Sequence, residues 1–402
     1  MLQVEEALQA ILEDIRILPK ETVPLAESLG RTLAENYFAR LDLPPFANSS
    51  MDGYAVAAAD CAAASAEQPV RLTVNGEAAA GSSISIPTSA CTAIRIFTGA
   101  PVPQGCNAVI PQEDVTVTED RSVILVHAPV TPGAYIRSKA SDVAAGTLIA
   151  HKGTVVTPFA LLSVASHGFD TIQVTRKPSV AIAATGSELI EPGQPLQFGQ
   201  IYNSNTYMLA AMAQLAGAIP AILPIAQDTE EETLRLLEEA QQYDLIITSG
   251  GVSVGDHDLV KSAIEKKGRL KLWRVNMKPG KPVAFGNVGA TPIIGLPGNP
   301  VSSAVTCALF ALPTIHKMLG RSEVSHENFT AFLTEPVTQS DRRSYIRCSL
   351  AYKDGAAYIT PLGSQDSHRT MSIAFMDVFA VIPEGSGKYP AGTLAQALRI
   401  RF

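Results

Sequence analysis

The sequence lacks the marks of several large classes of protein. Its 402 residues include five cysteines, an odd number with no C-x-x-C pair, so neither a disulfide framework nor a structural zinc site is expected. No apolar run approaches the roughly 20 residues that cross a bilayer, and Glu5, Glu6 and Glu13 stand where a signal peptide would be basic or apolar. These absences predict a protein of the reducing cytoplasm that has no membrane partner.

The sequence also has few charged residues. Charged residues make up 17% of the chain, the net charge is -7, and no run of lysine or arginine appears. Because phosphate backbones are held by basic surfaces, no nucleic-acid partner is expected. Hydrophobic residues reach 46%, which is ordinary for a globular protein, and the length suffices for roughly two to four domains.

What the sequence does contain is an alternation of strand and helix patterns between Lys177 and Gly320. The expected strands are 180–184, 219–225, 245–248 and 270–275 with a hairpin over 282–296, and the expected helices are 204–216, 230–241, 258–267 and 301–319. Such alternation predicts a three-layer α/β domain with a mostly parallel sheet between two layers of helices. Ligands of these sheets bind outside the carboxyl ends of the strands.

Strand patterns without helices flank this region. Short β-type runs broken by proline, glycine and serine fill residues 41–143 and predict a β-rich insertion. A second β pattern after Arg321 predicts a C-terminal β-barrel or sandwich. Apolar residues recur at helical spacing from Val4 to Leu18, so an amphipathic helix is expected to end at Pro19.

A glycine-rich turn is the most informative local feature. The segment Thr248-Ser-Gly-Gly-Val-Ser-Val-Gly-Asp-His-Asp258 joins an expected strand to an expected helix, where backbone N–H groups can bind an anion. Its glycines allow a phosphate to approach the main chain. Asp256 and Asp258 would repel that phosphate unless a divalent cation lay between them. The turn predicts a phosphorylated ligand handled with a metal, and the alternative is a turn that serves packing alone.

Glu188 is expected at the same edge of the sheet, because Thr185-Gly-Ser-Glu-Leu189 follows the strand 180–184. There its carboxylate could join Asp256 or Asp258 around a cation. The competing interpretation is a carboxylate that stabilises the N-terminus of a helix, and Glu188 taken by itself favours that interpretation.

Three cations fall within one short strand and turn, at Arg274, Lys278 and Lys281. They suit a multiply charged oxyanion, or else they form a solvated charged turn. Pro297 and Gly298 end a later strand and open a helix, which again offers N–H groups to an anion. Two further loops contain Asp52 and Thr98, and local chemistry alone assigns neither a function.

Six motifs occur together in a characteristic order. They are Ser50-Met-Asp-Gly-Tyr-Ala55, Phe97-Thr-Gly-Ala100, Thr185-Gly-Ser-Glu-Leu189, Ser249-Gly-Gly-Val-Ser-Val-Gly255, Lys278-Pro-Gly-Lys-Pro282 and Gly295-Leu-Pro-Gly-Asn-Pro-Val301. Over essentially its whole length the chain resembles the molybdopterin molybdenumtransferase family, MoeA and the gephyrin E domain.

The resemblance implies an activity and an assembly. Members of that family insert molybdate into adenylylated molybdopterin, release AMP and use Mg²⁺. They are homodimers with the active site between subunits, and they contact the molybdopterin adenylyltransferase. The implied domains are an α/β domain (1–19 and 177–321), a hinge domain (20–40 and 144–176), a β-rich inserted domain (41–143) and a C-terminal β-barrel (322–402). The cysteines are then core residues, because the sulfur ligands belong to the pterin.

The resemblance also implies roles for individual residues. The implied catalytic residues are Asp52, Glu188, Asp258, Lys278 and Lys281, and the implied Mg²⁺ ligands are Glu188, Asp256 and Asp258. The implied substrate-binding residues are Thr98, Asp142, Asp228, Ser249, Gly250, Gly251, Arg274, Pro297, Gly298, Arg342 or Arg347, and Ser367. Two departures from the family pattern, Ser187 for an aspartate and Ala140-Ser-Asp142 for Gly-Glu-Asp, suggest a looser cation shell.

Other functional classes share parts of this pattern. The gephyrin E domain clusters membrane receptors, but it follows another domain and a linker, whereas this chain begins with the family's first helix. A molybdopterin adenylyltransferase shares the Ser-Gly-Gly turn but is an isolated α/β domain. A tungstate-inserting relative stays open, since tungstate matches molybdate in charge and shape. Whether a molybdate oxygen or water attacks the adenylate also stays open.

Overall fold

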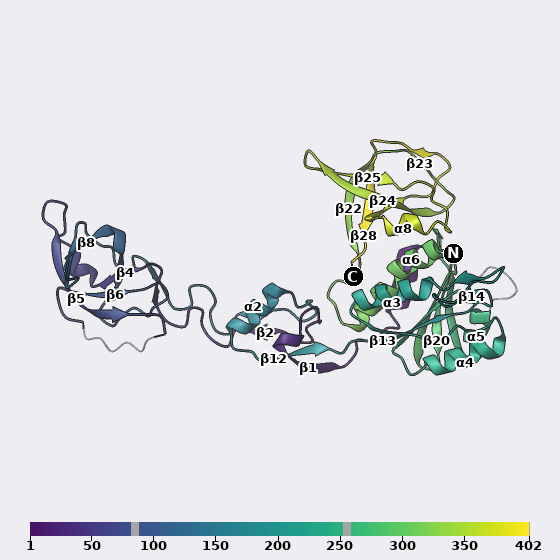
Figure 1. The fold of residues 1–402 in the computed structure, drawn as a ribbon, viewed down its shortest axis with the longest axis horizontal. Helices are drawn as coiled ribbons and strands as arrows, with labels where there is room; N and C mark the ends of the chain where they lie inside the picture. The colour runs from purple at the N-terminus through teal and green to yellow at the C-terminus, as the bar shows by residue number, and fades with distance from the viewer. Residues whose placement is uncertain (82–87, 252–258, 402) are drawn as a thin grey trace. The chain divides into compact units, whose positions relative to one another are not determined.

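The chain forms two compact units, each with its own hydrophobic core (Figure 1). The computed structural model describes residues 1–81, 88–251 and 259–401. The main unit comprises Met1–Glu35, Lys152–Pro158 and Thr171–Phe402, and the inserted unit comprises Asn36–His151 and Phe159–Asp170. The finer division into four domains stays a prediction.

A six-stranded sheet forms the centre of the main unit. In spatial order its strands are β16 (Ile219–Ile222), β13 (Ser179–Ala184), β17 (Leu245–Ser249), β21 (Thr291–Leu296), β20 (Pro282–Val288) and β18 (Gly268–Arg274). The first four pair in parallel, whereas β20 runs antiparallel to both of its neighbours. The mostly parallel sheet and the hairpin over 282–296 are therefore confirmed.

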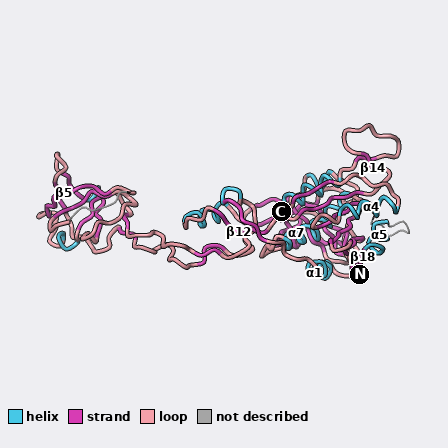
Figure 2. Tube along the Cα trace, turned by 90° about the horizontal axis from the view of Figure 1, so that it is seen from below, coloured by secondary structure: helices cyan, strands magenta, loops and turns pink. Residues whose placement is uncertain are grey.

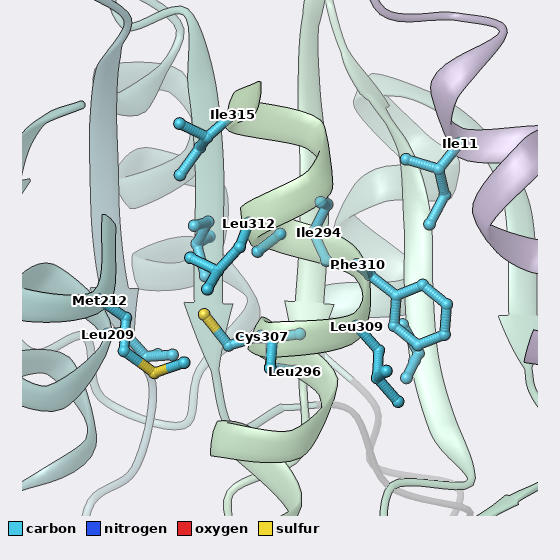
Figure 3. Close-up of a cluster of buried hydrophobic side chains, with 14 of the residues drawn as sticks. Ile11, Leu209, Met212, Ile294, Leu296, Cys307, Leu309, Phe310, Leu312 and Ile315 are labelled. Atoms are coloured by element: carbon cyan, nitrogen blue, oxygen red, sulfur yellow. The ribbon is translucent and has the colours of Figure 1, made fainter. Parts of the chain in front are cut away.

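Helices cover both faces of this sheet (Figure 1). One layer contains α1 (Val4–Leu12), α3 (Asn205–Leu215), α6 (Pro300–Thr306) and α7 (Leu312–Met318), and the other contains α4 (Glu230–Ala240) and α5 (Leu259–Lys267). Successive strand residues serve opposite cores, so Ile246 packs under α4 and α5 while Ile247 packs under the other layer. Figure 3 shows the latter core, where Leu309, Phe310 and Leu312 lie near Ile294. The three-layer architecture is confirmed.

The N-terminal helix is shorter than expected. α1 ends at Leu12, so the prediction of a helix running to Pro19 was wrong. Ile15 is nevertheless buried, and the Leu18 N–H donates to the Met318 carbonyl at 2.8 Å. The apolar spacing beyond Leu12 therefore reflects tertiary packing on α7 rather than continued helix.

Proline ends or interrupts two other predicted elements. The expected helix over 301–319 consists of α6, a π turn (Cys307–Ala311) and α7, because Pro313 has no N–H to donate within the helix. The expected strand over 219–225 stops at Ile222, before Pro224. Both predictions were correct in type and wrong in extent.

A closed β-barrel occupies the C-terminal part of the main unit. Its strands, in order around the barrel, are β24 (Arg343–Lys353), β25 (Ala356–Pro361), β22 (Glu327–Leu333), β28 (Leu394–Arg399) and β26 (Val378–Ile382). Pairing of β26 with β24 closes it, which confirms the barrel rather than an open sandwich. β19 (Met277–Lys278) adds to β24 in parallel, and this pairing joins the barrel to the turn after β18. The short helix α8 (Met371–Ala374) precedes β26.

The inserted unit is β-rich, as predicted. Its six-stranded sheet has the order β7 (Ala108–Pro111), β4 (Gly53–Val56), β6 (Thr92–Ile96), β5 (Val70–Ala78), β9 (Val123–Val126) and β8 (Val115–Val117). Helix α2 (Pro158–Ser166) belongs to the same unit from its second residue onward. Leu72, Ile110 and Ile124 are among the apolar side chains that fill its core.

Short two-stranded pairs complete the architecture. They are β1 (Lys20–Pro24) with β12 (Thr171–Thr175), β2 (Tyr37–Phe38) with β11 (Leu148–Ala150), β3 (Asn48–Ser49) with β10 (Ile136–Arg137), β14 (Leu189–Ile190) with β15 (Ile201–Tyr202), and β23 (Val337–Thr338) with β27 (Lys388–Tyr389). The chain at β14 extends as a loop from the main unit (Figure 2). None of the helices in the described ranges has the length and apolar character needed to cross a bilayer.

Candidate functional site

The carboxyl ends of three parallel strands meet at one edge of the central sheet. Ala184 of β13 lies opposite Ser249 of β17, and Ser249 lies opposite Leu296 of β21. The turns that follow these strands begin with Thr185, Gly250 and Pro297. The register therefore brings together the three turn motifs that the sequence had placed at the ligand-binding edge.

Two glycines in these turns have room for no larger residue. Gly250 has φ of +89°, and an added Cβ would lie 2.8 Å from the Thr185 carbonyl oxygen. Gly251 has φ of +67°, and its Cβ would lie 2.4 Å from Val260 Cγ2. Both positions combine a left-handed backbone with a close approach, so packing alone would already require glycine there.

A cavity of about 1160 Å³ opens at this edge. Its lining includes Thr185, Gly186, Glu188, Asn205, Asp228, Ser249, Gly250, Gly251, Lys281, Pro297, Gly298, Asn299 and His368. Thr185 is 5% exposed, and its buried hydroxyl oxygen has no hydrogen-bond partner among the described residues. An unpaired buried hydroxyl at the wall of a cavity is a ready contact for a ligand.

Two carboxylates face this cavity. Glu188 and Asp228 both line it, and Ser187 connects the turns that hold them. The Ser187 N–H donates to Asp228 Oδ2 at 3.1 Å, and the Asp228 N–H donates to Ser187 Oγ at 3.2 Å. Ser187 stands where an aspartate is usual in the family, and its two hydrogen bonds hold Asp228 in place.

These carboxylates bear on the predicted Mg²⁺ site. The two remaining predicted ligands, Asp256 and Asp258, lie outside the described residues. Within those residues no group of three or more His, Cys, Asp or Glu side chains could hold a metal ion. Glu188 and Asp228 fit a different arrangement, in which one or two carboxylates share Mg²⁺ with the phosphates of a substrate.

The predicted basic residues gather near the cavity but only in part within it. Lys281 lines the cavity, whereas Arg274 and Lys278 are exposed and are absent from the described lining. Arg342 donates from Nη1 to the Met277 carbonyl at 3.1 Å, so it lies against the backbone next to Lys278. The barrel therefore supplies a cation to the turn that contains Lys278 and Lys281.

The sequence analysis did not identify Asn205. Its Nδ2 donates to Ser249 Oγ at 2.9 Å and to the Gly298 carbonyl at 2.7 Å, so one amide bridges two of the turns. The available signal was a polar Ser204-Asn205 pair at the start of a helix that follows an edge strand. This pattern is common at helix starts, so it does not single out a ligand-binding residue.

The barrel contributes a third wall. The Ser367 carbonyl accepts a hydrogen bond from the Val301 N–H at 3.3 Å, and the neighbouring His368 lines the cavity. Arg347, proposed from sequence as an alternative to Arg342 for substrate binding, is instead wholly buried in the barrel. A side chain that is 0% exposed is not presented to a ligand, so this placement favours Arg342.

The predicted residues of the inserted unit form a separate group. Asp52 Oδ1 accepts hydrogen bonds from the Thr98 N–H and the Thr98 hydroxyl, both at 2.8 Å. These bonds, with a smaller contribution from the charge of Arg95, hold the pKa of Asp52 below its usual value. Thr98 thus orients Asp52 as an ionised carboxylate. Asp142 is exposed in the same unit.

Thiol chemistry finds no support in the described structure. All five cysteines are free, and burial raises the pKa of Cys307 and of Cys348 to about 12. Such thiols stay protonated at neutral pH and are poor nucleophiles. Cys61 is also buried, but Cys91 is exposed, so the interpretation of every cysteine as a core residue was wrong for Cys91.

Fold and site define a class: a multidomain α/β protein whose glycine-rich turns line a cavity at the carboxyl edge of its parallel strands. Family models identify it further. Those described as "MoeA N-terminal region (domain I and II)", "Probable molybdopterin binding domain" and "MoeA C-terminal region (domain IV)" match residues 2–168, 181–317 and 330–400.

Relatives that match over nearly their whole length agree with these family models. A Mycobacterium tuberculosis protein named molybdopterin molybdenumtransferase 2 is 37% identical, over 98% of this chain and 99% of that protein. A molybdopterin molybdenumtransferase of Haemophilus influenzae is 34% identical, over 98% and 97%. The crystal structure of a molybdopterin biosynthesis MoeA protein from Pyrococcus horikoshii superposes with a TM-score of 0.85 at 30% identity, covering 99% of this chain and 100% of that one. The chain belongs to the molybdopterin molybdenumtransferase family.

Proposed function

We propose that this chain inserts molybdate into adenylylated molybdopterin and releases AMP. Membership of the family makes it a transferase of molybdenum cofactor biosynthesis. The observation that carries the finer proposal is the cavity at the sheet edge, where glycine turns, two carboxylates and Lys281 meet. A phosphorylated, multiply charged ligand suits this combination of groups.

The chemistry requires two anions to come together. Adenylylated molybdopterin has a phosphoanhydride and a dithiolene, and molybdate is a tetrahedral dianion, so the two substrates repel each other in water. Lys281 within the cavity, with Lys278 and Arg274 on the adjoining turn, would neutralise and orient the oxyanion. Gly250 and Gly251 would let phosphate oxygens approach the backbone.

Glu188 and Asp228 are the described residues that would hold Mg²⁺ together with the substrate phosphates. When bound there, Mg²⁺ supplies Lewis-acid polarisation of the anhydride. The Ser187 contacts keep Asp228 in place, and the Thr185 hydroxyl, which has no hydrogen-bond partner among the described residues, would donate to a phosphate oxygen. No side chain needs to act as a covalent nucleophile, and either a molybdate oxygen or water would attack the adenylate phosphorus.

The proposal includes a homodimer in which Asp52, oriented by Thr98, faces the cavity of the partner subunit. Its support is the family resemblance together with the pairing of Asp52 and Thr98, which leaves an ionised carboxylate on an exposed turn. A cytoplasmic location and contact with the adenylyltransferase that supplies the nucleotide belong to the same proposal. The cysteine chemistry is compatible with a reducing compartment.

A single-turnover assay tests the function. The full chain is incubated with adenylylated molybdopterin, Mg²⁺ and either molybdate or tungstate, and AMP release is followed. We expect AMP release that depends on Mg²⁺ and on the oxyanion, and Lys281→Ala should lower kcat/KM by roughly 10- to 100-fold by removing a charge-assisted contact. Lys353→Ala, at the end of β24 and exposed, is the matched control. Wild-type protein that binds the nucleotide but releases no AMP with either oxyanion would refute the proposal.

A further inference from the structure

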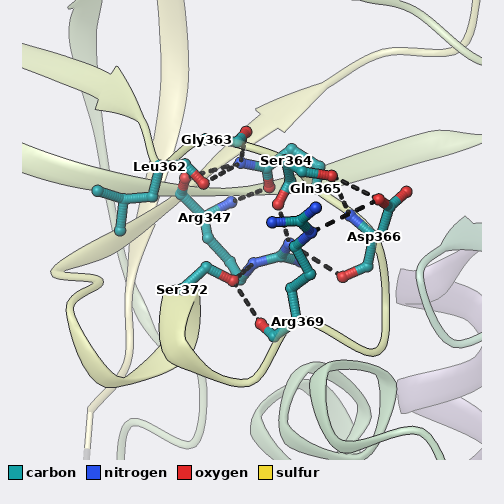
Figure 4. Close-up of polar contacts among 8 residues, drawn as sticks. All are labelled: Arg347, Leu362, Gly363, Ser364, Gln365, Asp366, Arg369 and Ser372. Carbon is teal, nitrogen blue, oxygen red and sulfur yellow. Dashed lines mark hydrogen bonds and ion pairs between the residues drawn. The ribbon is translucent and has the colours of Figure 1, made fainter.

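An arginine is the largest fully buried side chain in the described structure. Arg347 on β24 is 0% exposed, and its hydrogen bonds converge on one loop (Figure 4). Its Nε donates to Ser372 Oγ at 2.7 Å, and its Nη2 donates to the carbonyls of Ser364 at 3.1 Å and Asp366 at 3.3 Å. All three acceptors lie within residues 362–372, which comprise the loop after β25 and the first two residues of α8 and which we call the Arg347 loop.

The backbone of Arg347 also forms hydrogen bonds with this loop. Its N–H donates to Gln365 Oε1 at 2.9 Å, and its carbonyl accepts from the Leu362 N–H at 2.9 Å and from Gln365 Nε2 at 3.3 Å. Figure 4 shows Arg347 among Leu362, Gln365 and Ser372 of this loop. One strand residue thus contacts the start, the middle and the end of the Arg347 loop.

The position of this loop matters because it forms the barrel's side of the cavity. Between the residues held by Arg347 lie Ser367, whose carbonyl bonds the Val301 N–H of α6, and His368, which lines the cavity. Both side chains can donate hydrogen bonds to an oxyanion. Their placement depends on the conformation of the loop rather than on a regular element.

Burying a guanidinium in the interior of a barrel costs free energy. Desolvation of a charged group costs several kcal/mol, and an apolar side chain of similar volume is often at least as stable. The hydrogen-bond acceptors of Arg347 are neutral carbonyls and a hydroxyl, so no ion pair offsets that cost directly. What the guanidinium does provide is a rigid fork of donors for loop carbonyls that an apolar residue would leave unpaired.

We propose that Arg347 is a positioning residue, which holds the Arg347 loop in the conformation that anchors Ser367 to α6 and presents His368 to the oxyanion or phosphate of the substrate. This inference rests on the proposed function and adds a residue that acts without touching the ligand. Arg347 thereby links the interior of the barrel to the cavity of the α/β domain.

The test compares Arg347→Met with Arg399→Met, which removes a half-buried arginine from β28 of the same barrel. Hydrogen exchange of residues 362–372 should be faster in Arg347→Met only. The KM for adenylylated molybdopterin should rise roughly 10- to 100-fold, with a smaller change in kcat. Added guanidinium ion should partly restore an Arg347→Ala variant, and Arg347→Lys should restore less because a lysine lacks the planar fork.

The outcomes separate this inference from the proposed function. If wild-type protein releases no AMP, the function fails, and the inference is still judged by loop exchange and by binding of adenylylated molybdopterin. The inference is overturned if Arg347→Met shows wild-type exchange in the loop, or if the loop loosens and nucleotide binding is unchanged. Should Arg347→Met not fold, Ser372→Ala removes only the Nε acceptor, and the same two readouts apply to it.

Discussion

Single residues set the backbone of the turns that carry the site. Gly250 and Gly251 adopt left-handed conformations and lie in contact with neighbouring turns, so the backbone geometry requires glycine at both positions. Ala140 is the opposite case, because it adopts φ of +61° without being glycine. The family's usual glycine at that position would avoid the steric strain of a left-handed alanine. This departure therefore concerns local stability in the inserted unit.

Replacing that alanine tests the point. Ala140→Gly should stabilise the inserted unit by up to about 1 kcal/mol, because relief of left-handed strain outweighs the greater chain entropy of glycine in the unfolded state. Urea unfolding of the full chain, monitored by hydrogen exchange in the inserted unit, measures the change. Ala144→Gly, in the same unit at a position without positive φ, should destabilise instead. Equal effects of the two substitutions would show that the φ of Ala140 is not strained.

The charged side chains in and beside the cavity should divide by role. Glu188→Gln keeps the shape of the side chain and loses a charge proposed to hold Mg²⁺. It should bind adenylylated molybdopterin nearly normally and release AMP roughly 100-fold more slowly, most markedly at limiting Mg²⁺. Lys278→Ala should instead weaken substrate binding, and higher molybdate should partly rescue turnover if the contact is to molybdate. AMP release by Glu188→Gln at the wild-type rate would move the metal site elsewhere.

At the scale of elements, the segment from α7 to β22 contains two buried histidines. His316 on α7 is 0% exposed, and His326 before β22 is also buried. Burial, together with smaller contributions from the positive charges of Arg321 and Arg401, lowers the pKa of His316 to about 3, and a hydrogen bond to the Val324 carbonyl opposes this shift. Burial also lowers the pKa of His326. These elements therefore pack around two neutral imidazoles.

That arrangement predicts a pH dependence of stability. A depressed histidine pKa means that the unfolded chain binds the proton more readily, so stability is full above pH 6.5 and falls as the pH drops from 6.5 toward 3. His316 alone should contribute a slope of up to about 1.4 kcal/mol per pH unit below its unfolded pKa. Urea unfolding at pH 7 and pH 5 measures this loss. His316→Gln should flatten it and the exposed His151→Gln should not, and equal slopes in all three proteins would exclude the mechanism.

At the scale of the whole molecule, the proposed chemistry draws on both units. The main unit holds the cavity with Glu188, Asp228 and Lys281, and the inserted unit holds the Asp52–Thr98 pair. Two compact units with separate cores can present their residues to different copies of the chain. The proposed homodimer uses this separation, since each cavity would receive Asp52 from the partner subunit.

Subunit mixing tests the shared site. Asp52→Asn and Lys278→Ala proteins should each be weakly active, whereas their heterodimer would contain one site free of both substitutions. Random exchange of equal amounts should recover about a quarter of wild-type activity, because half of the dimers would have one intact site of two. A mixture of Asp52→Asn with Thr98→Val is the control, since every site then has one altered inserted unit. If the first mixture gains no more activity than the control, each site lies within one subunit.

Much of the fold could be predicted because it depends on local patterns. Alternating β-branched runs and helical spacing identify the strands and helices of the central sheet, and short runs broken by proline and glycine identify the β-rich insertion. The ends of the elements were harder to predict, because α1 stops at Leu12 while Ile15 still packs in the core. The regular spacing of apolar residues reflects which side chains are buried, and burial continues after the helix has ended.

The sequence by itself determined the family, the glycine turns and the charged residues beside them, since their chemistry and order are local properties of the chain. Only the tertiary structure decided which of them meet. Strand register brings Thr185, Ser249 and Pro297 to one edge, and barrel packing brings in His368. It also buries Arg347, which the sequence could not distinguish from Arg342, because exposure depends on contacts between residues far apart in the chain.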